Sequence, residues 1–353
     1  MSTSGNRVCQ VTNRLLAHDP SLTCLTLANH PGVPRVVMDA MAHNSVVRKA
    51  HFELTEWDDE QCDELLQSGA PNHALESLFL TRNNITSAGL PALSQVLERG
   101  RLTSLNLSAN PLGSELAPLG RAIARNCLAV LSLNETQRHG EGIEALVCEL
   151  ARGTHSLTAL HLQGNGIGED VAERIAPALV ATVVALYLGK NRVGDAGAAI
   201  LARACVAGAR TRPVLQRLSL LDNAVGDDGA RPFAEALGVN PGLQQLNLSH
   251  NRIGDAGVVS LSCAVQRNTR LRTLDVGVSS HCSREAAQAL HHQMAREQLT
   301  SRQHRAFRDV SRLLLLAHGS HAHQRAADPL CKLPHAVLLL ILTLAAPPNF
   351  ELQ

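Results

Sequence analysis

Histidine and cysteine are the side chains in this sequence best suited to metal binding or nucleophilic catalysis. Three histidines stand close together at His318, His321 and His323. No cysteine or carboxylate accompanies them, so we interpret this stretch as a linker rather than a metal site. The nine cysteines are odd in number and form no Cys-x-x-Cys pair, which indicates neither a zinc ribbon nor a closed disulfide framework. We expect most of them to be small buried core residues.

A catalytic site would need further groups beside such residues. His161 has no second histidine, aspartate and serine in a relationship that would support a triad. No glycine-rich loop follows a strand in the context that phosphate binding requires. We therefore predict that the chain has no catalytic residue, binds no cofactor and no metal, and is not an enzyme.

The composition excludes strong electrostatic steering by the chain as a whole. There are 32 lysine and arginine residues against 31 aspartate and glutamate residues, for a formal net charge of +1. This balance creates no field that would attract nucleic acid or an anionic lipid surface. Met1 to Leu16 lacks an apolar stretch of signal-peptide length, so we expect a cytoplasmic protein.

A repeated leucine pattern explains how a chain with only 2% aromatic residues can build a core. The phrase Leu-x-x-Leu-x-Leu-x-x-Asn-x-Ile/Val/Leu recurs, and a helical stretch follows each copy. Ten copies, some of them degenerate, begin at Leu22, Val47, Leu75, Leu102, Leu128, Leu157, Val183, Leu215, Leu243 and Leu271. The consensus asparagines are Asn83, Asn110, Asn165, Asn191, Asn223 and Asn251, and the first copy is aligned with Asn29 in that place.

Each part of the phrase has a physical reason. Alternation predicts a short parallel strand, with Leu218 and Leu220 pointing inward and Ser219 outward. The asparagine lies where the chain leaves the strand, and its amide can bind the backbone groups of the turn. In later copies Gly-Asp-x-Gly opens the helix, as in Gly254 to Gly257, with the aspartate placed to cap that helix or to favour its positive end.

The predicted fold is therefore an α/β solenoid. Helices are wider than strands, so stacked repeats curve into a horseshoe with parallel strands on the concave face and helices on the convex face. Most repeat starts lie 25 to 29 residues apart, but 32 residues separate Val183 from Leu215. We predict that the excess, around Gly208 to Pro213, is a loop insertion on one face.

The phrase and the Gly-Asp-x-Gly that follows it resemble the ribonuclease-inhibitor subclass of leucine-rich repeats, over Ser21 to Cys282. The resemblance implies a non-enzymatic scaffold or regulator that binds a protein partner on its concave face or rim. The subclass also includes GTPase-activating proteins of the Ran type, which use the rim and characteristically carry an acidic tail that this chain lacks. The expected organisation is an N-terminal cap at 1–20, about ten repeats at 21–282, a helical cap and linker at 283–324, and an apolar helix at 325–353.

Outward strand positions are the candidate partner-binding residues of the concave face. Phe79 and Tyr187 are the best anchors, because aromatic side chains on an exposed face are frequent hot spots, unless both merely cover neighbouring apolar surface. The full column is Phe79, Asn106, Ser132, His161, Tyr187, Ser219, Asn247 and Asp275. On the rim, Lys190, Arg192 and Arg252 either meet a partner or form a solvated edge.

The sequence after the repeats predicts helices of two kinds. Ser283 to His318 contains neither glycine nor proline, and Leu290 and Met294 begin a helical apolar spacing, so we expect amphipathic helices that seal the end of the core. Ala336 to Ala346 is apolar on every side but shorter than the ~20 residues that span a bilayer, so we expect no membrane insertion.

The apolar helix has a second interpretation. Leu333-Pro334-x-x-Val337-x-x-x-Ile341-Leu342 resembles the first helix of an F-box, the motif that docks substrate receptors onto the Skp-family adaptor of cullin-RING ubiquitin ligases. The later half of that motif is missing. Two hypotheses stay open, since the helix either caps the solenoid or docks an adaptor, which would make the chain the substrate receptor of a ligase.

Overall fold

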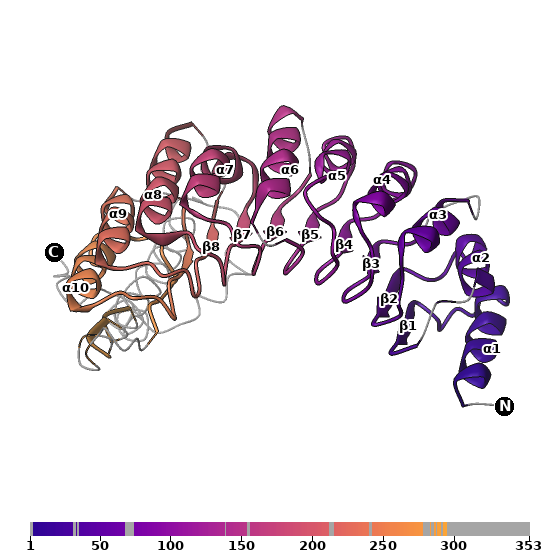
Figure 1. The fold of residues 1–353 in the computed structure, drawn as a ribbon. Helices are drawn as coiled ribbons and strands as arrows, with labels where there is room; N and C mark the ends of the chain where they lie inside the picture. The colour runs from indigo at the N-terminus through magenta and orange to yellow at the C-terminus, as the bar shows by residue number, and fades with distance from the viewer. Residues whose placement is uncertain are drawn as a thin grey trace, which may run out of the picture.

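The computed structural model describes residues 3–30, 33, 35–67, 74–137, 139–153, 156–211, 215–239, 242–277, 283, 286, 288–290 and 292–294. Within them, short strands alternate with helices along an arc (Figure 1). The strands are β1 (Cys24–Ala28), β2 (Lys49–Glu53), β3 (Ser77–Phe79), β4 (Ser104–Asn106), β5 (Val130–Ser132), β6 (Ala159–His161), β7 (Ala185–Tyr187), β8 (Arg217–Ser219), β9 (Gln245–Asn247) and β10 (Thr273–Asp275). The helices are α1 (Thr3–Leu16), α2 (Arg35–His43), α3 (Asp59–Gln67), the 3₁₀ helix η1 (Ser87–Gly89), α4 (Leu90–Arg99), α5 (Ala117–Ile123), α6 (Glu141–Arg152), α7 (Glu169–Thr182), α8 (Gly194–Thr211), α9 (Asp227–Gly238) and α10 (Asp255–Val265).

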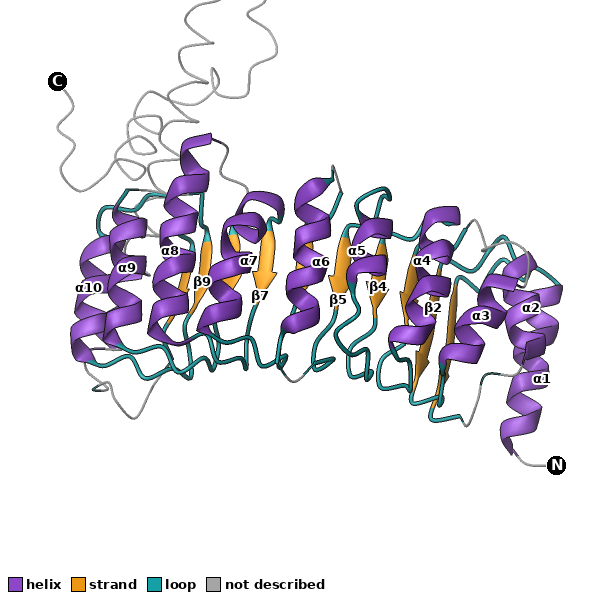
Figure 2. Ribbon diagram, turned by 45° about the horizontal axis from the view of Figure 1, so that its top comes forward, coloured by secondary structure: helices purple, strands orange, loops and turns teal. Residues whose placement is uncertain are grey.

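The ten described strands form one parallel sheet whose order is the order of the chain, β1 to β10. The strands line the inner side of the arc and the helices its outer side (Figure 1), and the helices stand in a row in front of the sheet in Figure 2. The predicted α/β solenoid is confirmed, with one strand from each of the ten repeats.

The core is built from the aliphatic positions of the repeated phrase. Leu218 and Leu220, which point inward from β8 and the turn after it, are 2% and 0% exposed. Equivalent leucines of neighbouring repeats join them in one continuous apolar cluster along the array. Larger rings enter it near the N-terminal end, where Phe52 and Trp57 lie with their ring centroids 5.0 Å apart. Because the apolar side chains of successive repeats pack on one another, each repeat is stabilised by its neighbours.

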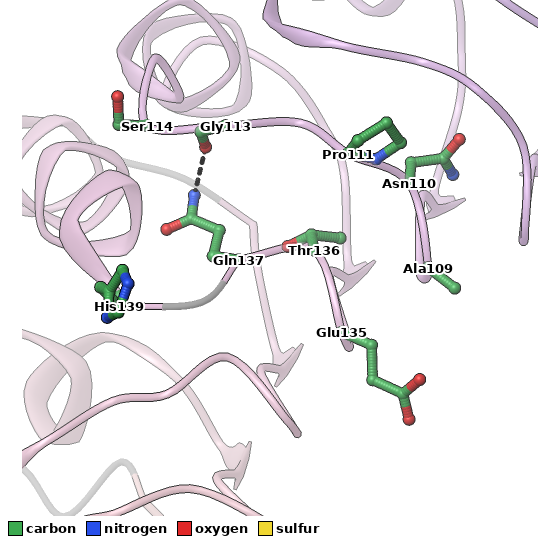
Figure 3. A pocket seen from close by; sticks show the side chains of 10 residues that line it. Ala109, Asn110, Pro111, Gly113, Ser114, Glu135, Thr136, Gln137 and His139 are labelled. Carbon is green, nitrogen blue, oxygen red and sulfur yellow. Dashed lines mark hydrogen bonds between the residues drawn. The ribbon is translucent and has the colours of Figure 1, made fainter.

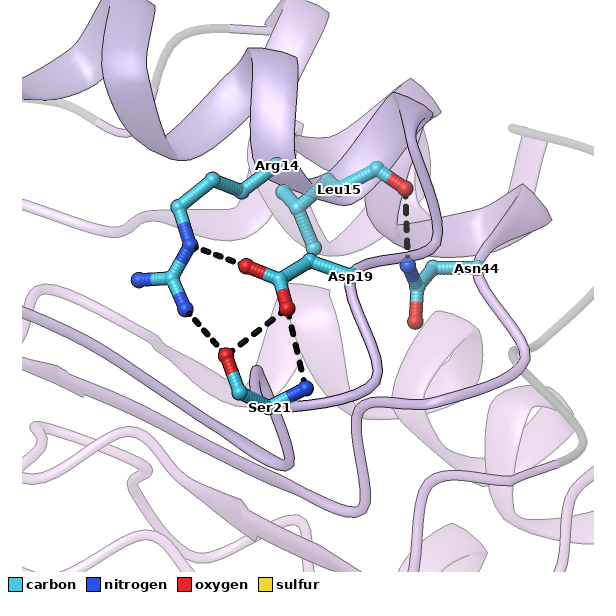
Figure 4. Close-up of polar contacts among 5 residues, drawn as sticks. All are labelled: Arg14, Leu15, Asp19, Ser21 and Asn44. Carbon is cyan, nitrogen blue, oxygen red and sulfur yellow. Dashed lines mark hydrogen bonds and ion pairs between the residues drawn. The ribbon is translucent and has the colours of Figure 1, made fainter.

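Helix α1 covers the N-terminal end and is tied to the first repeats by polar contacts (Figure 4). The amide of Asn44 donates to the carbonyl oxygen of Leu15 across 2.7 Å. Beyond the helix, the Asp19 carboxylate pairs with Arg14 at 2.6 Å and accepts from the hydroxyl of Ser21 at 2.7 Å. These contacts, led by the Ser21 hydroxyl, lower the pKa of Asp19 to about 2.

The consensus asparagines join consecutive repeats. Asn223 Nδ2 donates to the carbonyl oxygen of Leu188 in the preceding repeat (2.8 Å) and to that of Leu221 in its own turn (3.1 Å). Its Oδ1 accepts from the backbone N–H of Val193, again in the preceding repeat. The same bridging arrangement is made by Asn83, Asn110, Asn165, Asn191 and Asn251. Each buried amide therefore serves backbone groups of two turns.

We expected the aspartate of Gly-Asp-x-Gly to cap its own helix or to favour the positive end of that helix. It does lie in the first turn of that helix, but it does not cap it. Instead, Oδ1 of Asp195 in α8 accepts from the N–H groups of Gly226 (2.6 Å) and Gly229 (2.9 Å), which begin α9. Asp227 binds the start of α10 in the same way. The helices stand side by side, so a carboxylate in the first turn of one helix lies nearest the free N–H groups of the next.

Two further expectations are corrected. Helix α8 runs on to Thr211, so the excess residues between Val183 and Leu215 lengthen a helix at least to that point and do not form a loop from Gly208. Asn29 does not occupy the consensus asparagine position. Its φ of 54° matches the 56° of Arg82, the residue before the consensus asparagine of the third repeat, so the position after Asn29 is the equivalent one.

Residues after β10 continue the array. The backbone N–H of Ser283 donates to Asp255 in α10 (2.7 Å), and the Ser283 hydroxyl accepts from the N–H of Ala286 (3.2 Å). Leu290 and Met294 are buried in the core cluster. The described part of the segment that we predicted to seal the core therefore packs on the C-terminal end of the core.

Candidate functional site

One column of side chains crosses the concave face, because the strands pair in register. One outward residue of each strand lies beside that of the next, as His161 at the end of β6 lies beside Tyr187 at the end of β7. Along the sheet the column reads Thr26, His51, Phe79, Asn106, Ser132, His161, Tyr187, Ser219, Asn247 and Asp275. The structure therefore brings all eight predicted concave residues into one row.

Two pairs of rings stack within this column. His161 and Tyr187 have ring centroids 4.3 Å apart and planes inclined by 14°. His51 and Phe79 are closer to parallel, at 4.1 Å and 6°. Each pair is half-buried and presents a flat apolar surface with a polar ring edge, a combination that suits protein contact.

The neutral form of the ring is favoured in both stacked histidines. Burial lowers the pKa of His161 below its ordinary value. The pKa of His51 is also lowered, by burial first and then by the charge of Lys49, while Glu53 opposes the shift. Neutral imidazole rings lose less solvation against an aromatic ring than charged ones do.

His51 was absent from the sequence-predicted site. It holds the same place in the second repeat as Phe79 holds in the third. Counting four residues on from Val47 identifies it, but the leucines that mark the pattern are replaced there by Val47, Ala50 and Phe52.

Four of the predicted concave residues have their polar atoms engaged or covered. The side-chain oxygens of Asn106, Asn247 and Asp275 accept from their own backbone two residues further on, at 2.9 Å in each case. Ser219 is only 8% exposed. These residues shape the strand ends, so Phe79, His161 and Tyr187 offer the larger contact surfaces.

The predicted rim cations lie on the turns after the strands. Lys190 has a left-handed backbone with φ of 54°, and Lys190, Arg192 and Arg252 are all exposed. Within the described ranges, no carboxylate lies at ion-pair distance from these three side chains. Lys190 and Arg192 line one groove together, and Arg252 does not line it.

A second groove, of about 610 Å³, adjoins the first on the same rim (Figure 3). Its walls are the turns after β4 and β5, and Gln137 fixes them together by donating from Nε2 to the carbonyl oxygen of Gly113 across 2.7 Å. Figure 3 shows Glu135 pointing away from Gln137 and His139. Such a groove can hold a protein loop, but its side chains form no catalytic constellation.

The cysteines differ from expectation. Five of the seven described ones, Cys9, Cys24, Cys127, Cys148 and Cys263, are exposed, and only Cys62 and Cys205 are buried. Among the residues that the structure describes, no group of three histidine, cysteine or acidic side chains is placed to hold a metal ion.

Several predicted residues lie outside the described ranges. They are His318, His321 and His323 and the adaptor-docking candidates Leu333, Pro334, Val337, Ile341 and Leu342. In the part of the chain that is described, no helix combines the length and apolar character needed to cross a bilayer.

Comparison with known proteins agrees with this geometry. A family described as leucine-rich repeat matches residues 154–176, 213–234 and 239–262. The chain is 30% identical over 181 residues to human podocan-like protein 1, covering 51% of this chain and 31% of that protein. It is also 30% identical over 183 residues to pig ribonuclease inhibitor, covering 50% of this chain and 38% of the relative. The chain thus spans about a third of the length of these curated relatives.

A solved structure supports the fold. The leucine-rich-repeat-containing protein LegL7 from Legionella pneumophila superposes with a TM-score of 0.52 and 16% sequence identity. The match covers 81% of this chain and 94% of that one. At this identity the likeness concerns the fold alone.

Proposed function

Because the chain is a leucine-rich-repeat protein of the ribonuclease-inhibitor-like type, we propose that it binds a protein partner on its concave face without catalysing a reaction. The observation that carries the proposal is the pair of ring stacks in one register column, His51 with Phe79 and His161 with Tyr187. Stacked rings are already ordered, so a partner that packs on them loses little side-chain entropy on binding.

The surroundings of the stacks favour a protein over a smaller ligand. Between them the column holds Asn106 and Ser132, which are uncharged and half-exposed. A long shallow surface of this kind lacks the enclosed pocket in which small molecules are buried. Five exposed free thiols support our further proposal that the protein works in the reducing cytoplasm.

The test is partner capture by immobilised full-length protein, read by quantitative mass spectrometry and followed by affinity measurement with the purified partner. We expect Phe79→Ala with Tyr187→Ala to weaken binding at least tenfold, since buried aromatic anchors commonly contribute more than about 1.4 kcal/mol each. Val239→Ala with Val259→Ala is the matched control, because it removes apolar side chains that are 64% and 58% exposed in the helix layer.

Melting curves must agree among the three proteins for this comparison to count. Equal affinity of the double aromatic variant and the wild type would refute a concave contact centred on these rings.

A second candidate function is that of a ubiquitin-ligase substrate receptor that docks a Skp-family adaptor through Leu333, Pro334, Val337, Ile341 and Leu342. The observation that favours it concerns the end of the array. Leu290 and Met294 are only 1% and 5% exposed, and Gln293 donates to the carbonyl oxygen of Ser262. An earlier segment therefore already covers the last repeat, so covering that repeat does not require the apolar helix predicted at 325–353.

A chain that ends at Gln324 separates docking from capping. If the tail docks an adaptor, truncation leaves the melting temperature unchanged and abolishes co-purification of Skp-family and cullin subunits. If the tail caps the solenoid, truncation lowers the melting temperature and promotes aggregation, and the full chain recovers no ligase subunit. The second result would exclude the receptor function and leave concave binding untouched.

A further inference from the structure

The turn after β6 differs from the other turns of the rim. Both residues that flank its consensus Asn165 are glycines, Gly164 and Gly166. Their φ angles are 70° and 66°, in the left-handed region that glycine adopts most readily. In the other repeats with a consensus asparagine, the flanking pairs are Arg82 and Asn84, Ala109 and Pro111, Lys190 and Arg192, Asp222 and Ala224, and His250 and Arg252.

These two glycines line a slot in the rim. The slot measures about 540 Å³ and has Gly164 and Gly166 as its floor. Gln137 and His139 of the preceding turn form one wall, and Lys190 and Arg192 of the following turn form the other. We call this feature the rim slot.

The floor of the rim slot is held firmly, and one of its donors has no partner within the described ranges. Asn191 Oδ1 accepts from the N–H groups of Asn165 (2.9 Å) and Ile167 (3.0 Å), which stand on either side of Gly166. The Gly166 N–H between them has no hydrogen-bond partner among the described residues. A rigid turn that holds such an N–H in place offers a preformed donor to an oxygen ligand.

The cationic wall is also fixed in place and available. The backbone of Lys190 donates to Leu221 at 2.7 Å, and that of Arg192 donates to Ile167 at 2.8 Å. Neither side chain has an ion-pair partner within the described ranges. Asp222 also lines the slot, beyond Lys190, and is the acidic group that competes with an incoming anion.

We propose that the rim slot binds an acidic side chain of the protein partner, with Lys190, Arg192 and the Gly166 N–H as its donors. The inference rests on the proposed function, since the acidic group belongs to the protein that the concave face holds. Arginine and lysine together with a backbone N–H bind carboxylate or phosphate oxygens through charge-assisted hydrogen bonds. A carboxylate and a phosphorylated side chain share this chemistry.

The direct test is a titration of the full chain, followed by the backbone amide signals in ¹⁵N–¹H spectra. The probes are a blocked Ala-Glu-Ala peptide, inorganic phosphate, and a blocked Ala-Gln-Ala peptide as the uncharged control. We expect a saturable shift of the Gly166 amide with the glutamate peptide or with phosphate, and none with the glutamine peptide. The anion that saturates at the lower concentration identifies the preferred group.

Matched variants locate the binding. Arg192→Gln should weaken anion binding at least tenfold, because it removes a charge-assisted hydrogen bond. Arg252→Gln is the control, since Arg252 holds the same place two repeats later and its backbone likewise donates to Val225 in the preceding repeat (2.7 Å). Asp222→Asn should tighten binding by removing the competing carboxylate. Equal weakening by both arginine variants, or an unmoved Gly166 signal, would overturn the proposal.

Filling the slot provides an independent variant. Gly164→Asn places a side chain where Lys190, Asp222 and His250 stand in other repeats with φ of 54–57°. Its Cβ would lie 2.8 Å from Cγ of Glu135, a side chain that can move aside. We expect a folded array with a slightly lowered melting temperature, because the new side chain displaces Glu135, and loss of anion binding.

Partner capture then separates the two proposals. Loss with Arg192→Gln and Gly164→Asn supports the rim slot. Retention with both variants, but loss with Tyr187→Ala, overturns the slot and leaves the concave face in place.

Discussion

Oδ1 of Asp195 lies 2.9 Å from the backbone nitrogen of Gly229, which is 34 residues further along the chain. The same oxygen accepts from Gly226 at 2.6 Å, so one carboxylate caps the helix of the next repeat. A Cβ on Gly229 would lie only 2.6 Å from this oxygen, which explains the glycine at that place. Neighbouring helices are therefore joined by charge-assisted bonds as well as by apolar contact.

Asp195→Ala should lower the free energy of unfolding by about 1–3 kcal/mol, because two helix N–H groups lose their acceptor. Urea denaturation followed by circular dichroism measures the change. Asp228→Ala is the control, since Asp228 is exposed and makes only a 3.4 Å surface ion pair with Arg231. That variant should change stability by less than about 0.5 kcal/mol. An equal change in the free energy of unfolding for the two variants would show that the cap between repeats contributes nothing to stability.

Asn223→Leu should destabilise the array by about 1–3 kcal/mol, because buried backbone groups of two turns lose their amide partner. Asn223 is 0% exposed, and its amide reaches both Leu188 and Leu221. Asn84→Leu, at an exposed asparagine on another turn, is the comparison. An unchanged unfolding midpoint for Asn223→Leu would remove the bridging argument.

The local pattern predicted the fold and the concave column because both depend on spacing within one repeat. The period of two in each strand places Ser219 and Tyr187 outward wherever the repeat occurs. What the pattern could not predict depends on neighbouring repeats. The ring stack of His161 on Tyr187 and the cap from Asp195 to Gly229 each need the register between two repeats.

Asparagines before the strands were missed for the same reason. Asn268 donates to the carbonyl oxygen of Leu237 in the preceding repeat (2.8 Å) and accepts from the N–H of Leu271 (2.7 Å). Asn44 makes equivalent contacts, and Asn126 likewise donates to the carbonyl oxygen of Leu97 in the preceding repeat. Their spacing of three residues before Val47 and Leu271, and two before Leu128, is visible in the sequence, but it falls outside the repeated phrase.

The reactivity of each cysteine thiol should depend on whether it is buried or exposed. Burial raises the pKa of Cys62 and of Cys205 to about 12, so neither forms the reactive thiolate at neutral pH. We expect N-ethylmaleimide to modify Cys148 and the other exposed thiols of the folded protein well before these two, as mapped by peptide mass spectrometry. Labelling in urea is the control, in which all should react alike. Equal rates for Cys62 and Cys148 in the native protein would contradict the buried placement.

Acidification should lower the stability of the folded protein because of the histidines on its concave face. Burial holds the pKa of His161 below the ordinary 6.5, so on acidification the unfolded chain takes up this proton before the folded chain does. The stabilisation is thus complete above pH 6.5 and declines as the pH falls from there through the folded-state pKa. No carboxylate or cationic side chain stands at its two register neighbours, Ser132 and Tyr187, to offset the loss.

His161→Phe should flatten this pH dependence, because phenylalanine can keep the stack on Tyr187 and takes up no proton. Urea unfolding at pH 7.5, 6.5, 5.5 and 5.0 measures it, and the wild type should lose more stability over the acidic interval than the variant. His51, whose pKa is lowered in the same direction, contributes equally to both proteins, so the difference reports His161 alone. His250→Gln, at an exposed rim position, should follow the wild type. Parallel curves for the wild type and His161→Phe would show that burial of this imidazole does not disfavour its charged form.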